Sequence, residues 1–187
     1  SNFQMAEDWG THRCINWPQA SVQVQRSLQF LNAHEDQPSF LLMHIMDMHL
    51  PYKEPLQYRS LFVDETPEGI DLTGYFVRHE VIRMAKKGGD KFKEYIRGRY
   101  DNNMRYLDDV LMDLFEDLGD QAPVLIFSDH GEEFWEHNEF EHGHSLYDEL
   151  LKVPLVVKAP GLSGQVSSLP VSLLDVTPTT LALAGLR

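Results

Sequence analysis

The sequence V-L-I-F-S-D-H-G-E-E-F-W-E-H-N-E-F-E-H-G-H-S-L-Y-D-E-L-L-K-V-P-L-V-V, residues 124–157, decides the fold. Its first four residues form a short apolar run typical of a buried strand. Asp129 and His130 follow where that strand should end, and a second apolar run begins after Pro154. In open α/β sheets, ligands bind just beyond the carboxyl ends of strands. Asp129 and His130 are therefore candidate metal ligands; the alternative is a polar loop with an acidic surface.

A second strand of the same kind is predicted at residues 40–46, where F-L-L-M-H-I-M is almost continuously apolar. It ends at Asp47 and His49, so two predicted strands are each followed by an Asp and a His. Parallel strands present the same end to one edge of a sheet, so residues from three separate segments should meet there. The residues expected to converge are Asp47, His49, Asp129, His130 and His142. Taken alone, His49 could instead be a hydrogen-bonded residue of a loop. His44, inside the apolar run, is predicted to lie in the core.

Segments with apolar residues at helical spacing flank these strands in the sequence. The predicted fold is therefore α/β, with a mainly parallel sheet sandwiched between helices. Residues 53–90 contain Pro55, Pro67 and Gly69 and are predicted to make an irregular excursion over the active edge, where substrate loops lie. The helix predicted at its end should stop at Gly88–Gly89, and the next should run from a cap at Asp90 to a stop at Gly119. The predicted helices cover residues 19–33, 77–87, 90–118 and a short stretch from Pro178.

Composition limits the partners of this chain. Its 187 residues suit a single domain or most of one, and no apolar run approaches membrane-spanning length. The 29 acidic and 16 basic residues give a net charge of -13, which argues against nucleic acid and anionic membrane surfaces as partners. An anionic substrate would need a locally positive pocket made by metal and histidine. The single Cys14 excludes an internal disulfide.

Several segments, in their order along the chain, together resemble the second half of a sulfatase domain, in the alkaline phosphatase superfamily. The most specific is S-D-H-G-E-E at 128–133, followed by H-G-H-S-L-Y-D-E-L-L-K-V-P-L at 142–155 and A-P-G at 159–161. The others are H-I-M-D-M-H-L-P-Y at 44–52, R-Y-D-N-N-M-R-Y-L-D-D-V-L at 99–111 and L-L-D-V-T-P-T-T-L at 173–181. The resemblance covers almost the whole chain and implies the sulfatase-like α/β fold over residues 1–187.

The resemblance also implies roles for particular residues. Asp129 and His130 match the family's later pair of metal ligands, and His49 matches the histidine that contacts the sulfate or phosphate oxygens. His142 falls where the family places a Lys or His facing the same group, so His49 and His142 are the candidate catalytic and substrate-binding residues. His144 is the alternative if the register of the loop shifts by two. His137 matches no family position and is predicted to be a surface residue.

The resemblance implies a divalent cation, with Ca²⁺ favoured by the hard oxygen of Asp129. Because imidazole at His130 also suits Zn²⁺ or Mn²⁺, those ions remain open. The family's nucleophile segment, Cys/Ser-x-Pro-Ser-Arg, is not found here, since Cys14 is followed by Ile-Asn-Trp. We therefore expect this chain to be the C-terminal portion of a sulfatase domain that needs the N-terminal half as its partner and is inactive alone.

The function implied by the resemblance is hydrolysis of a sulfate monoester, in a small molecule or a glycan, by the intact protein. An extracytoplasmic or periplasmic location is favoured on the same ground. Two alternatives stay open within the superfamily: hydrolysis of a phosphoester or phosphonate, and transfer of phosphoethanolamine. A third alternative, from a different class of protein, is a noncatalytic fragment that binds a metal or a glycan.

Overall fold

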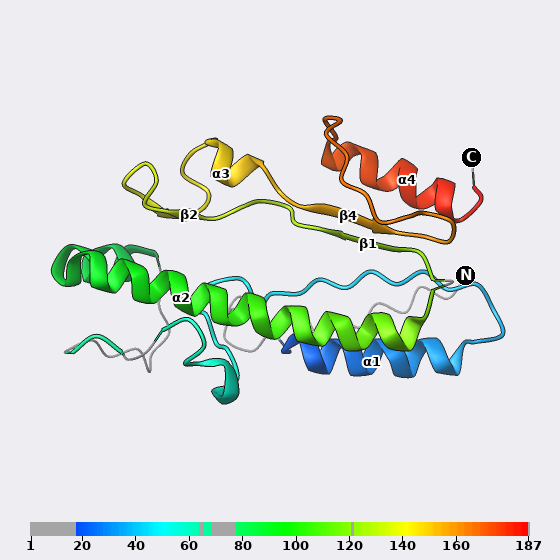
Figure 1. Cartoon of the computed structure of the whole chain (residues 1–187), viewed down its shortest axis with the longest axis horizontal. Helices are drawn as coiled ribbons and strands as arrows, with labels where there is room; N and C mark the ends of the chain where they lie inside the picture. The colour runs from blue at the N-terminus through cyan, green and yellow to red at the C-terminus, as the bar shows by residue number, and fades with distance from the viewer. Residues whose placement is uncertain (1–17, 64–65, 69–77, 121, 187) are drawn as a thin grey trace. The chain divides into compact units, whose positions relative to one another are not determined.

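The computed structural model describes residues 18–63, 66–68, 78–120 and 122–186. The predicted connecting segment before Pro18, which includes Cys14, lies outside the described residues, as do residues 69–77 of the predicted excursion. The chain divides into two compact units, one of residues up to 77 with 98–111, the other of residues 78–97 with 112–187. Figure 1 labels their elements, and each unit is described by itself.

Helix α1 (Ala20–Ala33) begins the described part of the first unit and confirms the predicted helix. Ala20, Val24 and Ser27 are buried at spacings of four and three, so they lie on one face. The side chain of Gln19 makes no capping bond; instead, Oδ2 of Asp47 accepts a hydrogen bond from the Ala20 N–H at 3.0 Å. Burial raises the pKa of Asp47 despite this bond. Asp47 therefore caps a helix, a role that the sequence analysis did not include.

Helix α2 (Arg78–Leu118) contributes its middle part to the first unit. The Tyr106 hydroxyl accepts a hydrogen bond from Ser21 N at 3.1 Å and donates one to Ser21 Oγ at 2.9 Å, which joins α1 to α2. The buried amide of Asn102 accepts from Phe62 N and donates to Arg59 O, both at 3.0 Å. These bonds hold the chain that follows the 3-10 helix η1 (Leu56–Tyr58) against α2.

The ends predicted for the two central helices are confirmed. Gly89 interrupts α2 with φ 62°, and Gly119, with φ 64°, follows its last residue. Positive φ is costly for residues with a Cβ, so glycine is favoured at both positions.

A buried ion pair lies in the first unit. The side chain of Glu54 is fully buried and pairs with Arg99 from α2, whose side chain is 15% exposed. Arg99 also donates to the carbonyl of Tyr52, and Asn103 donates to Arg99 O at 3.1 Å. Burial of a charge is costly unless it is paired, so Glu54 and Arg99 depend on each other.

The second unit contains the strand that ends at the predicted metal ligands. Strands β1 (Val124–Phe127) and β4 (Leu155–Lys158) confirm the two strands predicted in this stretch. They pair with each other, and the pairing is antiparallel, with Val124 opposite Lys158. A parallel neighbour needs a crossover that carries the chain back along the sheet. The only helix in residues 128–154 is the one-turn α3 (Asp148–Leu151), which is too short for that.

The predicted strand at residues 40–46 is extended but belongs to no sheet within the described residues. Its side chains alternate between exposed and half-buried, and Phe40 and Leu42 are each 71% exposed. An apolar run becomes a strand only when a neighbour supplies the ladder of hydrogen bonds. A mainly parallel sheet is therefore not found in the described part of the chain, whose sheets are two antiparallel pairs.

The remaining elements of the second unit are short. Strands β2 (Glu133–Phe134) and β3 (Phe140–Glu141) form a hairpin. The 3-10 helix η2 (Leu173–Asp175) leads into α4 (Val176–Leu183), which confirms the short helix predicted around Pro178. Among the described residues, no helix is long and apolar enough to cross a membrane.

We predict that Glu54→Ala lowers the free energy of unfolding by about 3–5 kcal/mol, because it leaves the Arg99 guanidinium buried without its partner. The matched control is Lys152→Ala, which removes an exposed ion pair to Asp148 and should cost about 0.5 kcal/mol or less. Chemical denaturation measures both values. Similar losses in the two variants would contradict the role assigned to the buried pair.

Candidate active site

Asp129 and His130 occupy the turn directly after β1. The Ser128 hydroxyl donates to His130 O at 2.6 Å, and the His130 N–H donates to Asp129 Oδ1 at 3.1 Å. Gly131 N donates to Leu150 O at 2.9 Å, and a Cβ at Gly131 would lie 2.0 Å from the carbonyl oxygen of Glu149. Glycine is therefore needed at this position because the two backbones approach closely.

The ring of His130 is oriented as a metal ligand would be. Its Nδ1 lies 2.9 Å from the carbonyl oxygen of Gly131, which can only accept, so Nδ1 carries the proton and Nε2 is left as the acceptor. Nε2 lies 3.7 Å from Asp129 Oδ1, and the side chains of His130 and Asp129 are 40% and 76% exposed. Metal–ligand bonds of about 2.0–2.6 Å allow both atoms to reach one cation. These two residues fit a divalent metal.

His142 lies beside His130, with the ring centroids 3.9 Å apart and the planes at 33°. Its Nδ1 lies 2.9 Å from Oε1 of Glu132, and the side chains of Glu132 and His142 are 7% and 22% exposed. The hydrogen bond to Glu132 raises the pKa of His142 above its ordinary value. Partial burial acts in the opposite direction, and the charges of Glu132, Glu141 and Asp129 add to the rise.

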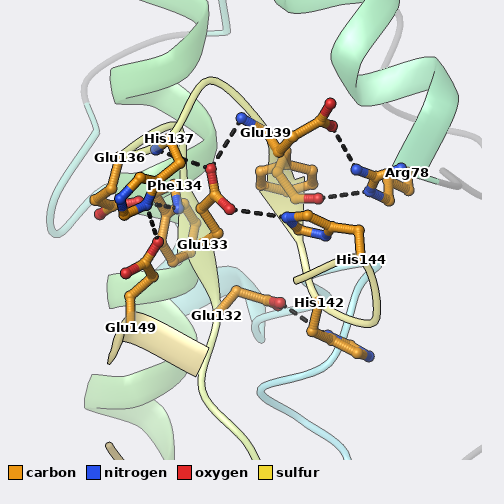
Figure 2. Close-up of polar contacts among 11 residues, drawn as sticks. Arg78, Glu132, Glu133, Phe134, Glu136, His137, Glu139, His142, His144 and Glu149 are labelled. Atoms are coloured by element: carbon orange, nitrogen blue, oxygen red, sulfur yellow. Dashed lines mark hydrogen bonds and ion pairs between the residues drawn. The ribbon is translucent and has the colours of Figure 1, made fainter. Parts of the chain in front are cut away.

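His144 is held by a different carboxylate, as Figure 2 shows. Its Nε2 lies 2.8 Å from Oε2 of Glu133, whose side chain is fully buried. The other oxygen of Glu133 accepts the N–H groups of His137 and Glu139 at 3.0 and 2.8 Å. The Nδ1 of His144 is buried and has no hydrogen-bond partner among the described residues. His144 is thus tied into the structure of the loop, whereas His142 lies against His130.

The hairpin explains why these carboxylates and histidines meet. Glu133 is opposite Glu141 in the antiparallel register, and continuing that register by one residue places Glu132 opposite His142. Residues directly opposite each other on paired strands have neighbouring side chains. Glu132 and Glu133 were not among the site residues predicted from the sequence. The sequence signal that could have indicated them is an acidic pair followed about ten residues later by His-x-His, with a turn at residues 136–139 between the two.

His137 is exposed, as predicted for a surface residue, with 43% of its side chain accessible, but it also has partners. Its Nδ1 lies 2.6 Å from Oε1 of Glu149, and its ring stacks on Tyr147 with centroids 3.6 Å apart. On the other side of the hairpin, Arg78 from α2 donates to Phe140 O at 2.7 Å and pairs with Glu139. These contacts fix the loop that carries His142.

His49 lies in the first unit, in the turn that follows the extended segment. Its Nδ1 lies 2.6 Å from the carbonyl oxygen of Leu50, which leaves the ring with Nε2 as its acceptor. Within the second unit, the structure brings together Asp129, His130 and His142. The convergence of His49 and Asp47 with them stays a prediction.

The buried carboxylate of Glu133 should make stability depend on pH. Burial alone would raise its pKa, but hydrogen bonds from His144 and the N–H groups of Glu139 and His137 outweigh burial and lower the pKa below 4.5. A carboxylate with a lowered folded-state pKa stabilises the protein above its unfolded-state pKa, and this stability is lost as the pH falls through the folded-state value.

We predict that Glu133→Gln lowers the free energy of unfolding by about 2 kcal/mol at neutral pH, because a charged acceptor of three hydrogen bonds is lost. The deficit should begin to shrink as the pH falls below the unfolded-state pKa of about 4.3, and it should vanish below the lower folded-state pKa, where the wild-type carboxylate is protonated. Denaturation curves at several pH values measure it. A deficit that stays constant down to strongly acidic pH would show that the charge of Glu133 is not responsible.

Comparison with known proteins agrees with the family resemblance of the sequence. The family model described as Sulfatase matches residues 19–186. The uncharacterized sulfatase YidJ of Escherichia coli is 27% identical over 176 residues, which are 87% of this chain and 35% of YidJ. Human arylsulfatase K is 30% identical over 63% of this chain and 22% of its own length. The choline-sulfatase of Rhizobium meliloti is 33% identical over 62% of this chain and 21% of its own.

The chain spans about a third or less of the length of these relatives. The family match nevertheless covers nearly all of it, including the strand that ends at Asp129 and the loop that carries His142. The chain therefore belongs to the sulfatase family.

Proposed function

We propose that the intact protein, meaning the full-length protein that contains this chain, hydrolyses sulfate monoesters. The observation that carries this proposal is the close, tilted contact of the His142 ring with the His130 ring, whose centroids are 3.9 Å apart, directly beside Asp129. It sets a candidate ester-binding histidine next to a candidate metal ligand. The relatives' names, choline-sulfatase and arylsulfatase K, support a sulfate ester as the substrate, in a small molecule or a glycan.

Asp129 and His130 would hold a divalent cation, and the protonated Nδ1 of His130 supports that assignment because it commits Nε2 to the metal. The carboxylate favours Ca²⁺, and the imidazole keeps Zn²⁺ and Mn²⁺ as alternatives. When bound, such a cation neutralises the nonbridging oxygens of the ester and lowers the pKa of the nucleophile.

The histidines have a separate task in this proposal. His142 and His49 would contact the ester oxygens, supply positive charge as the bond to the leaving oxygen breaks, and donate a proton to it. His144 is the alternative for His142. Its bond to the buried Glu133 favours a structural role and so supports His142 as the residue that contacts substrate.

The proposal places the nucleophile and the remaining metal ligands in the N-terminal half of the domain, outside this chain, so the chain alone would be inactive. Exposed apolar side chains support the proposal that further protein packs against this chain. Phe40 and Leu42 are each 71% exposed, and Val156 on β4 is 54% exposed. Exposed apolar surface of this kind usually packs against further protein. An extracytoplasmic location is proposed on the family resemblance.

The test compares hydrolysis of nitrophenyl sulfate and nitrophenyl phosphate by the intact protein, with and without removal of metal by a chelator. Preferred turnover of the sulfate ester, lost with the metal and restored by Ca²⁺, is the expected result. Preferred turnover of the phosphate ester would replace this proposal with a phosphoester hydrolase. No turnover of either ester, with metal bound, would favour a noncatalytic binding protein.

In the same assay, we predict that Asp129→Ala abolishes turnover and lowers the metal content, because one hard oxygen ligand is lost. Elemental analysis measures the metal directly. Asp148→Ala, which removes an exposed carboxylate on α3, serves as the control and should keep both metal and activity. Full metal occupancy in Asp129→Ala would refute the ligand assignment.

We predict that His142→Ala or His49→Ala leaves the metal content nearly unchanged and lowers turnover by roughly 100- to 10,000-fold, the scale for loss of a positioned acid or base. The matched control is His137→Ala, which removes another carboxylate-bound histidine of the same loop. It should lower stability without a comparable loss of turnover. Loss of metal together with activity would instead make the substituted histidine a metal ligand.

A further inference from the structure

Glu132 is a buried carboxylate that the proposed reaction does not yet use. Its side chain is 7% exposed, and it lies two residues beyond His130, where the chain enters β2. Its Oε1 lies 2.9 Å from Nδ1 of His142. A buried carboxylate is costly unless it has a partner, and here the partner is the histidine proposed to contact the ester.

The contact determines which nitrogen of His142 can react. A carboxylate accepts a hydrogen bond, so the proton on His142 stays on Nδ1, whether the ring is neutral or charged. Nε2 is then the nitrogen that can donate a proton to a leaving oxygen or contact an ester. One side of the ring also contacts the tilted ring of His130, which limits its rotation. Two contacts at different points of the ring therefore fix both its tautomer and its direction.

Two similar pairs in the same loop differ in their surroundings. Glu133 binds His144, but the remaining ring nitrogen of His144 is buried and has no hydrogen-bond partner among the described residues. Glu149 binds His137, whose ring stacks on Tyr147. In the part of the chain that the structure describes, His142 is the histidine of these three pairs whose ring contacts His130. This difference separates Glu132 from carboxylates that only hold the loop.

We propose that Glu132 is a positioning residue for His142: it fixes the imidazole ring and keeps the proton on Nδ1, so that Nε2 faces the reacting ester. This inference rests on the proposed function, because it assigns His142 a role in the reaction. It adds a residue that acts through His142 and touches neither the substrate nor the metal.

The experiment uses the intact protein and the variants Glu132→Ala and Glu132→Gln. For Glu132→Ala, the turnover number should fall about 10- to 100-fold, the usual scale for loss of an orienting partner, while the KM and metal content change little. Glu132→Gln keeps an oxygen acceptor and should recover part of the loss. It also covers the case in which Glu132→Ala does not fold. The matched control is Glu149→Gln, which weakens the pair with His137 and should keep the wild-type turnover number.

Nuclear magnetic resonance of protein labelled with ¹⁵N-histidine gives a readout that is independent of turnover. The Nδ1–H proton of His142, assigned by its absence in His142→Ala, should be visible in the wild type and lost or shifted in Glu132→Ala. An unchanged Nδ1–H signal or an unchanged turnover number in Glu132→Ala would overturn the inference, as would loss of metal. If the wild type hydrolyses neither ester, the proposed function fails, and the Nδ1–H signal still decides whether Glu132 holds His142.

Discussion

The buried carboxylate of Glu133 is the constraint on which the arrangement of the site depends. The loop between β1 and β4 packs two aromatic side chains on the buried Phe140, but most of its residues are polar, so polar contacts also determine its course. Glu133 accepts N–H groups from both His137 and Glu139, which closes the hairpin turn, and the ring of His144, which fixes the chain after β3. The antiparallel register then brings the next side chain, Glu132, against His142. One satisfied carboxylate thus sets the position of two histidines.

Helices and their ends were predicted from the sequence because they depend on residues that are close together along the chain. The glycines at 89 and 119 end the helices because positive φ excludes most other residues, and the helix at residues 19–33 was predicted from the helical spacing of its apolar residues. Sheet topology was not predicted correctly, because apolar runs carry no information about strand direction. The segment at 40–46 has the composition of a strand but no neighbour among the described residues.

In the candidate site, too, the features that depend on neighbouring residues were predicted, and those that depend on strand register were not. The position of Asp129 and His130 after a strand followed from the apolar run that precedes them, and the structure places them at that turn. The pairing of Glu132 with His142 was missed because it requires the register of a hairpin whose strands are two residues long. The pairing of Glu133 with His144 depends on the course of the chain after β3. Such short strands have almost no signature of their own, since period-two alternation needs at least four residues to be recognised.

A chain with a net charge of -13 is proposed to bind an anionic ester, so the site must limit the repulsion between its carboxylates and the substrate. The loop pairs its carboxylates: Glu132, Glu133 and Glu149 each lie against a histidine. The raised pKa of His142 favours its positive form, so the Glu132–His142 pair reduces the negative charge that a substrate would meet. Asp129 differs, because its side chain is 76% exposed beside His130. Its exposed charge would repel an anionic ester, and the proposed metal, bound there, would reverse that repulsion.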